Sequence, residues 1–134
     1  MRASTQSITI AASPEAVFAV VADPAKLPSW AIGFAHGVRR EGGTWLVRTG
    51  GGRELPIRID ADPGHGTVDY YMGVRPGAEV PAATRVVPND TGAEYTFTMF
   101  QPPGLPDDAF ETQIDELARE LTVLKARLES SCPL

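Results

Sequence analysis

The chain has one cysteine, two histidines and no long apolar segment. The single cysteine, Cys132, excludes an internal disulfide and favours a reducing compartment, so we expect a cytoplasmic protein. His36 and His65 lie in different surroundings and have no cysteine to pair with, so we expect no metal site. The apolar start is interrupted at Pro14, and no stretch is long enough to cross a bilayer. We therefore expect neither export nor a membrane span.

Basic residues are also scarce: 12 Lys and Arg stand against 17 Asp and Glu, a net charge of −5. Nucleic acids and anionic membranes attract basic patches, so neither is an expected partner. Gly50-Gly51-Gly52 lacks the Lys-Ser/Thr that follows in a phosphate-binding loop, and no serine lies in a nucleophile elbow, so we expect no cofactor. The 134 residues are enough for one domain, 1–134, with its own core.

What the chain does have is a regular succession of turns. Between Phe34 and Gln101 it reads as six strand-length runs. Each turn combines Gly with Pro, Asn, Asp or another Gly, residues that tolerate positive φ or pre-set the reversal. The predicted turns are Glu41–Thr44, Gly50–Gly52, Asp62–Gly66, Arg75–Gly77 and Asn89–Gly92.

Pairing these runs turn by turn places their apolar residues on one face of an antiparallel sheet, because side chains alternate along a strand. The opposite face carries charged residues, among them Arg58, Asp69 and Arg85. This register predicts five neighbouring pairs: His36 with Thr49, Val47 with Leu55, Ile57 with Tyr70, Tyr70 with Ala82, and Thr84 with Phe97.

The C-terminal part predicts one long amphipathic helix over about residues 106–129. Acidic residues crowd its first turn and basic residues lie near its end, as the helix dipole favours. Such a helix is long enough to cross the apolar face of the sheet. Its apolar residues recur at steps of four and three: Phe110, Ile114, Leu117, Leu121, Leu124 and Leu128.

The N-terminal third predicts one strand and two short helices. Gln6 to Ala11 alternates like a strand, and we expect it to pair with both the strand at Phe34 and the strand at Tyr95. Ser13-Pro14-Glu15 and Asp23-Pro24 are both helix starts, with a capping side chain followed by proline.

Two segments, Ser-Pro-Glu-Ala-Val-Phe at 13–18 and Asp-Pro-Ala-Lys-Leu-Pro-Ser-Trp at 23–30, carry a family resemblance. With the order of elements, they resemble the START-like, polyketide cyclase/dehydrase superfamily (SRPBCC, helix-grip fold). The resemblance implies an α+β helix-grip fold with one strand, two helices, six strands and one helix. Its seven-stranded curved antiparallel sheet would wrap around the long C-terminal helix. That superfamily includes lipid and hormone carriers, aromatase/cyclases and quinone-binding proteins, so the fold alone does not choose a function.

We expect a binding protein rather than an enzyme, with a small, mostly apolar or aromatic molecule held between sheet and helix. His36 would offer a donor and an acceptor to that ligand, although an inward histidine is also a common core residue. Of the two tryptophans, Trp45 is the better candidate for ligand contact than Trp30, which ends a short helix. The predicted ligand-binding residues are His36, Trp45, Ile57, Tyr70, Thr84, Phe97, Met99, Ile114 and Leu117.

Two alternatives stay open. The first is a polyketide cyclase/aromatase-like enzyme in which His36, assisted by Tyr70, acts as acid or base on a bound chain. The second is an interaction or co-chaperone module that uses the outer sheet face, although that face is charged and has no apolar patch. The sequence does not choose between a monomer and a homodimer.

Overall fold

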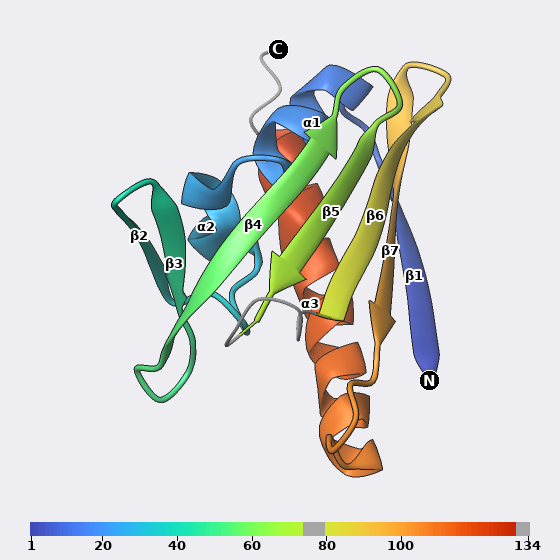
Figure 1. Ribbon diagram of the computed structural model, residues 1–134. Helices are drawn as coiled ribbons and strands as arrows, with labels where there is room; N and C mark the ends of the chain where they lie inside the picture. Colours follow the sequence, from blue (N-terminus) through green and yellow to red (C-terminus); the bar gives the residue numbers. More distant parts are fainter. Residues whose placement is uncertain (74–79, 131–134) are drawn as a thin grey trace.

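The computed structural model describes residues 1–73 and 80–130, in which seven strands and a long C-terminal helix dominate. Figure 1 shows the strands as one layer with the helices behind it. The elements follow the predicted order: β1 (Ala3–Ile10), α1 (Pro14–Val21), a short 3-10 helix η1 (Pro24–Lys26), α2 (Leu27–Trp30), β2 (Gly37–Glu41), β3 (Thr44–Arg48), β4 (Glu54–Asp62), β5 (Thr67–Met72), β6 (Val80–Asn89), β7 (Gly92–Phe100) and α3 (Asp107–Ser130).

The strands form one antiparallel sheet in the order β1-β7-β6-β5-β4-β3-β2. Three predicted pairs are confirmed: Val47 with Leu55, Tyr70 with Ala82, and Thr84 with Phe97. Ile57 lies opposite Met72 instead of Tyr70, because β4 is shifted by two residues against β5. A shift of two leaves every side chain on its predicted face. The predicted turn at Arg75–Gly77 lies outside the described residues.

The prediction that β1 pairs on both sides is half wrong. It pairs with β7 from Ala3 to Ile10, but the sheet order places it at one edge and β2 at the other. The expected strand at Phe34 begins only at Gly37, because residues 32–34 form a turn. The backbone N–H groups of Gly33 and Phe34 donate to the Glu120 carboxylate in α3. These amides therefore fasten the chain to the helix and are not available for pairing with β1.

The two short helices begin where the sequence predicts. Ser13 caps α1, its hydroxyl accepting from Ala16 N at 3.2 Å, and Asp23 caps η1 by accepting from Ala25 N at 3.0 Å. Proline occupies the first turn in both, where its missing N–H costs nothing. Together they place the fully buried Trp30 over the concave side of the sheet.

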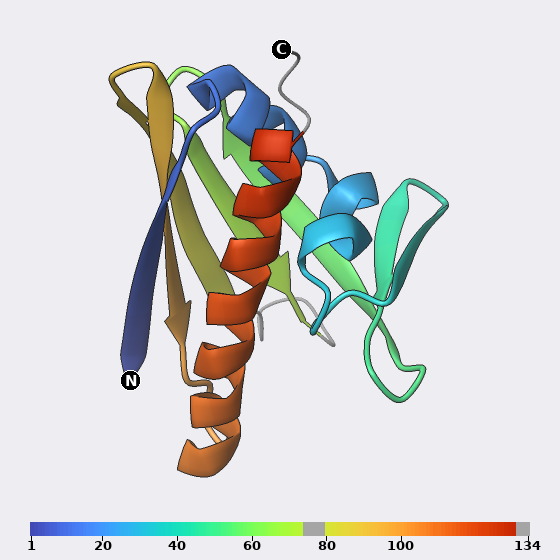
Figure 2. The same ribbon diagram turned by 180° about the vertical axis from the view of Figure 1, so that it is seen from behind.

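Figure 2, seen from behind, shows α3 lying across the sheet with α1 and α2 beside its C-terminal half. The predicted apolar stripe is largely confirmed: Phe110, Leu117, Leu121, Leu124 and Leu128 are buried. The four leucines belong to the same core as the inward side chains of the strands, which include Val47, Ile57, Val68, Tyr70, Ala82, Val86 and Tyr95. The core therefore lies between one face of the sheet and one face of α3.

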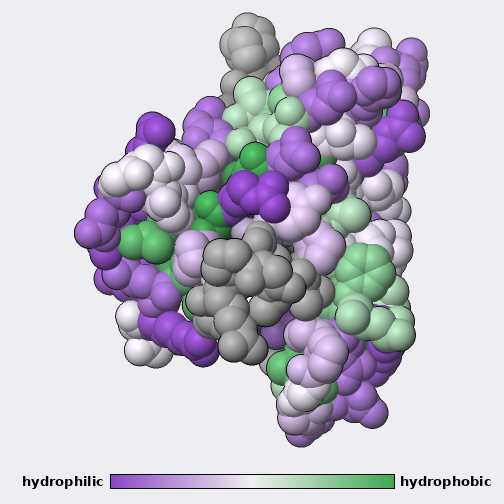
Figure 3. All heavy atoms as spheres, in the orientation of Figure 1, coloured by the Kyte–Doolittle hydropathy of each residue, from purple (hydrophilic) through white to green (hydrophobic). Residues whose placement is uncertain are grey.

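The other face of the sheet meets solvent. Arg58 and Arg85 are exposed as predicted, and Asp69 is half-buried between its neighbours. Figure 3 shows hydrophilic and neutral colours over most of this face, with smaller apolar areas. Within residues 1–73 and 80–130, no helix has the length and apolar character needed to cross a bilayer.

Candidate functional site

A pocket of about 500 Å³ lies between the concave face of the sheet and the N-terminal half of α3. The turn after α2 and the β3–β4 loop complete its wall. The lining is mostly apolar, with polar groups contributed by Thr49, Arg53, Gln113, Glu116 and Glu120. The pocket thus has the size and composition of a small-molecule site.

The floor of the pocket is built by the sheet. β4, β5, β6 and β7 contribute Ile57, Tyr70, Ala82, Phe97 and Met99, which lie on one face because they alternate with outward residues. The rings of Tyr70 and Phe97 stack, with centroids 5.9 Å apart and planes 21° apart. The two rings together form an aromatic surface in the wall of the pocket.

Five of the nine predicted ligand-binding residues line the pocket: Ile57, Tyr70, Phe97, Met99 and Leu117. The four others do not, and they fail for different reasons.

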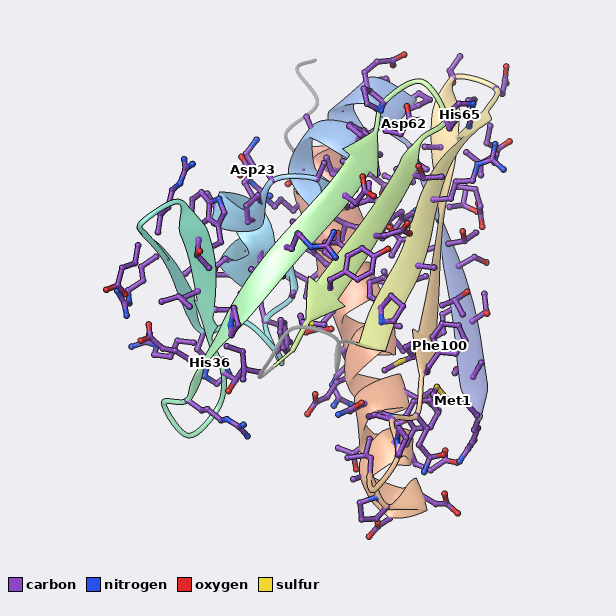
Figure 4. The ribbon with its side chains drawn as sticks, viewed as in Figure 1. Met1, Asp23, His36, Asp62, His65 and Phe100 are labelled. Atoms are coloured by element: carbon purple, nitrogen blue, oxygen red, sulfur yellow. The ribbon has the colours of Figure 1, made fainter. Side chains whose placement is uncertain are left out.

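His36 is the most consequential of these corrections. It is exposed and does not line the pocket, whereas its neighbour Ala35 is buried. Its backbone N–H donates to Arg48 O, and the Arg48 guanidinium donates to His36 O. Figure 4 places His36 beside the β3–β4 loop, away from α3. The alternation read from the sequence does not apply here, because the preceding residues form a turn instead of a strand.

Trp45 and Thr84 also lie outside the pocket. Trp45 is half-buried in the β2–β3 hairpin at the sheet edge, with the Arg40 guanidinium 5.8 Å from its ring centroid. Thr84 is buried, and its hydroxyl donates to Val68 O at 2.7 Å. The hydroxyl proton is used within the sheet, so Thr84 has no donor left for a ligand.

Two further predictions are wrong in detail. Ile114 is half-buried on α3 but does not line the pocket. The preference for Trp45 over Trp30 is reversed, since Trp30 lines the pocket and packs edge-to-face on Tyr95 with centroids 6.3 Å apart. The Trp30 indole N–H is buried and has no hydrogen-bond partner among the described residues.

The Tyr70 ring lines the pocket wall, but its hydroxyl is bonded away from the pocket. It donates to Val21 O at 2.5 Å and lies 3.3 Å from the Tyr95 hydroxyl. Burial raises the pKa of both phenols, so both stay protonated. Tyr70 therefore contributes an apolar surface, and its hydroxyl supports α1.

The main pocket residue missed by sequence reasoning is Glu120. It lies on α3 three residues after Leu117, which places a carboxyl group on the otherwise apolar stripe. That spacing is the signal that could have found it. Only 6% of the residue is exposed, and one oxygen, Oε2, accepts from Gly33 N and Phe34 N, each at 3.0 Å.

Burial raises the pKa of Glu120 to about 7. The two backbone donors oppose this by stabilising the carboxylate, nearby Glu116 raises the pKa further, and Arg119 lowers it. A carboxyl group with this pKa exchanges its proton near neutral pH, as acids and bases in enzyme sites do. In the part of the chain that the structure describes, no three His, Cys, Asp or Glu side chains are grouped to hold a metal ion.

Comparison with solved structures shows the same fold. XoxI from Bacillus cereus is similar at a TM-score of 0.78 and 17% identity, covering 96% of this chain and 96% of that one. The Aha1 dimer from Colwellia psychrerythraea is similar at a TM-score of 0.73 and 20% identity, covering 96% of this chain and 97% of that one. The di-domain ARO/CYC BexL from the BE-7585A biosynthetic pathway is similar at a TM-score of 0.69 and 21% identity, covering 94% of this chain and 46% of that one. No curated protein matches the sequence.

The comparisons confirm the helix-grip fold and the START-like resemblance predicted from the sequence. The model of one family matches residues 1–129, nearly the whole chain. The chain therefore belongs to the family described as polyketide cyclase / dehydrase and lipid transport.

Proposed function

We propose that this protein binds a small, mostly apolar molecule in the pocket between the sheet and α3. The observation that carries the proposal is a pocket of about 500 Å³ walled by side chains such as Ile57, Phe97 and Met99. Each Å² of apolar surface that a ligand buries there contributes about 25 cal/mol to binding. The family description, which includes lipid transport, supports an apolar ligand. A cytoplasmic location stays a prediction, and the choice between a monomer and a homodimer stays open.

The proposal is tested by narrowing the pocket. Leu55 lines the pocket, whereas Leu46, on the neighbouring strand β3, does not. We expect Leu55→Trp to weaken the binding of 2-naphthalenemethanol, measured by isothermal titration calorimetry. Leu46→Trp adds the same bulk and should leave the affinity unchanged. Equal affinities in both variants and the original chain would show that the probe binds elsewhere.

Glu120 favours a second candidate, a cyclase-like catalyst. With a pKa of about 7 its carboxyl group can give a proton to a ligand carbonyl oxygen or take one from the carbon beside it. The family description names cyclases and dehydrases, and BexL is itself described as an ARO/CYC. His36, the acid/base expected from the sequence, lies outside the pocket and is replaced by Glu120 in this role.

This candidate is tested with 2-acetylnaphthalene, a ketone with exchangeable protons. A catalytic Glu120 should accelerate hydrogen–deuterium exchange of its methyl group, followed by NMR. Glu120→Gln should abolish the acceleration, because an amide does not take up a proton. Exchange at the uncatalysed rate in the original chain would leave binding as the only supported function.

A further inference from the structure

One wall of the pocket carries two carboxyl groups. Glu116 and Glu120 lie on successive turns of α3, and both line the pocket. Both also lie against Gly33: Glu120 accepts from its N–H, and a Cβ built on Gly33 would lie 3.4 Å from Glu116 Cδ and Oε2. The two carboxyl groups therefore face the same small region of the pocket.

No cation pairs with either group across residues 1–73 and 80–130. The charged groups that influence Glu120 are Glu116 and Arg119 on its own helix, and Arg53 of the β3–β4 loop lines the same pocket. Glu120 Oε2 is satisfied by backbone donors, but within the described residues Oε1 has no hydrogen-bond partner. Unlike the buried indole N–H of Trp30, Oε1 keeps some exposure, so a donor group of a ligand in the pocket can reach it.

From this arrangement we infer that the pocket's ligand is a small apolar molecule carrying one protonated amine. Its ammonium group would donate to Glu120 Oε1 and lie beside Glu116, while its apolar body would lie on the aromatic surface of Tyr70 and Phe97. The inference rests on the proposed binding function and adds the polar group of the ligand. A carboxylate ligand would be repelled by the two carboxyl groups at this wall. An alcohol could donate a hydrogen bond to the Glu120 carboxylate, but it carries no positive charge to attract the two carboxyl groups.

The structural role of Glu120 is separable from this one. The contact that fastens the turn at Gly33 and Phe34 to α3 uses only an accepting oxygen. A glutamine keeps an accepting oxygen in the same place but has no charge. Glu120→Gln therefore removes the ammonium site while retaining the fastening. Asp115, exposed on the same helix and outside the pocket, supplies the matched control Asp115→Asn.

The test compares three probes that share one apolar body: 2-naphthylmethylamine, 2-naphthalenemethanol and 2-naphthoic acid. Calorimetry at pH 7 should give affinities in the order amine, alcohol, acid. Glu120→Gln should weaken the amine about 10- to 100-fold, the loss expected for a charge-assisted hydrogen bond. It should change the affinity for the alcohol by only a few-fold, and Asp115→Asn should change neither.

Proton release provides a readout that a purely structural role would not alter. Near pH 7 the free carboxyl group of Glu120 is about half protonated, and an ammonium ion favours its ionised form. Amine binding measured in two buffers of different ionisation enthalpy should therefore release about half a proton. In Glu120→Gln the release should disappear.

The possible outcomes separate this inference from the proposed function. If the alcohol binds as tightly as the amine, or if Glu120→Gln binds the amine normally, the amine inference is wrong while apolar binding stands. If none of the three probes binds, both are wrong. Should Glu120→Gln not fold cooperatively, Glu116→Gln takes its place, and unchanged amine affinity there would also overturn the inference.

Discussion

Glu120 should make the stability of this protein fall as the pH rises from acidic to neutral. Its folded pKa of about 7 lies above the ordinary value of 4.5, because the group is buried. The folded state therefore binds the proton more tightly than the unfolded state. The stabilising effect of protonation is complete below pH 4.5, is lost between pH 4.5 and 7, and stays lost above pH 7.

The size of this effect follows from the two pKa values. Linkage over the interval from pH 5 to pH 8 gives a loss of about 2.5 kcal/mol from this one group. Glu120→Gln does not titrate, so the free energy of unfolding of the original chain minus that of the variant should fall by this amount. In urea the difference between the two midpoints should move by about 1–2 M.

The difference between the two proteins isolates Glu120 from other carboxyl groups. Glu54, Asp62 and Glu129 have lowered pKa values because hydrogen bonds stabilise their carboxylates, so they lose stabilising contacts as the pH falls. Both proteins share these groups, and their contributions cancel. Urea unfolding followed by tryptophan fluorescence, to which the buried Trp30 contributes, gives the measurement. Parallel stability curves from pH 5 to pH 8 would refute the assignment of a raised pKa to Glu120.

Three further substitutions test the fold and the corrected site. Gly66→Ala should cost about 1–3 kcal/mol more than Gly51→Ala in chemical denaturation, because both have positive φ but only at Gly66 would the new Cβ lie 2.3 Å from Val86 O. Tyr70→Phe should lower stability by about 1–2 kcal/mol yet leave probe affinity within about twofold, since its hydroxyl bonds outside the pocket. His36→Ala should change the unfolding free energy by less than about 0.5 kcal/mol and leave calorimetric affinity unaltered, because the side chain is exposed outside the pocket. Weaker binding in Tyr70→Phe would show that the Tyr70 hydroxyl contacts the ligand, and weaker binding in His36→Ala would return His36 to the site.

Much of the sheet was predictable because turn chemistry and alternation are local signals. The turns at Gly42-Gly43 and Asn89–Gly92 connect adjacent strands as expected, and the positive φ values of Gly42 and Gly43 explain the choice of glycine. Because side chains alternate along each strand, the predicted face is correct from one strand to the next. Ile57 and Phe97 therefore lie on the pocket wall as predicted, even though β4 is shifted by two residues against β5.

The polar part of the site was harder to predict, because it depends on contacts between distant segments. The turn at Gly33 is held by a hydrogen bond to the Glu120 carboxylate, 87 residues later in the chain. Nothing in the sequence of residues 31–36 indicates that partner. Extending the alternation through that turn predicts the wrong position for His36. The sequence does not single out Glu120, because one charged residue beside leucines on a long helix is ordinarily exposed to solvent.

The most direct test of the proposed binding site uses the three methionine methyl groups as reporters. Met72 and Met99 line the pocket, whereas Met1 is 79% exposed and serves as an internal control. Titration of methyl-¹³C-methionine protein with 2-naphthalenemethanol should move the Met72 and Met99 resonances along one saturable curve and leave Met1 in place. Unmoved Met72 and Met99 signals at concentrations that saturate binding would contradict the proposal that this pocket holds the ligand.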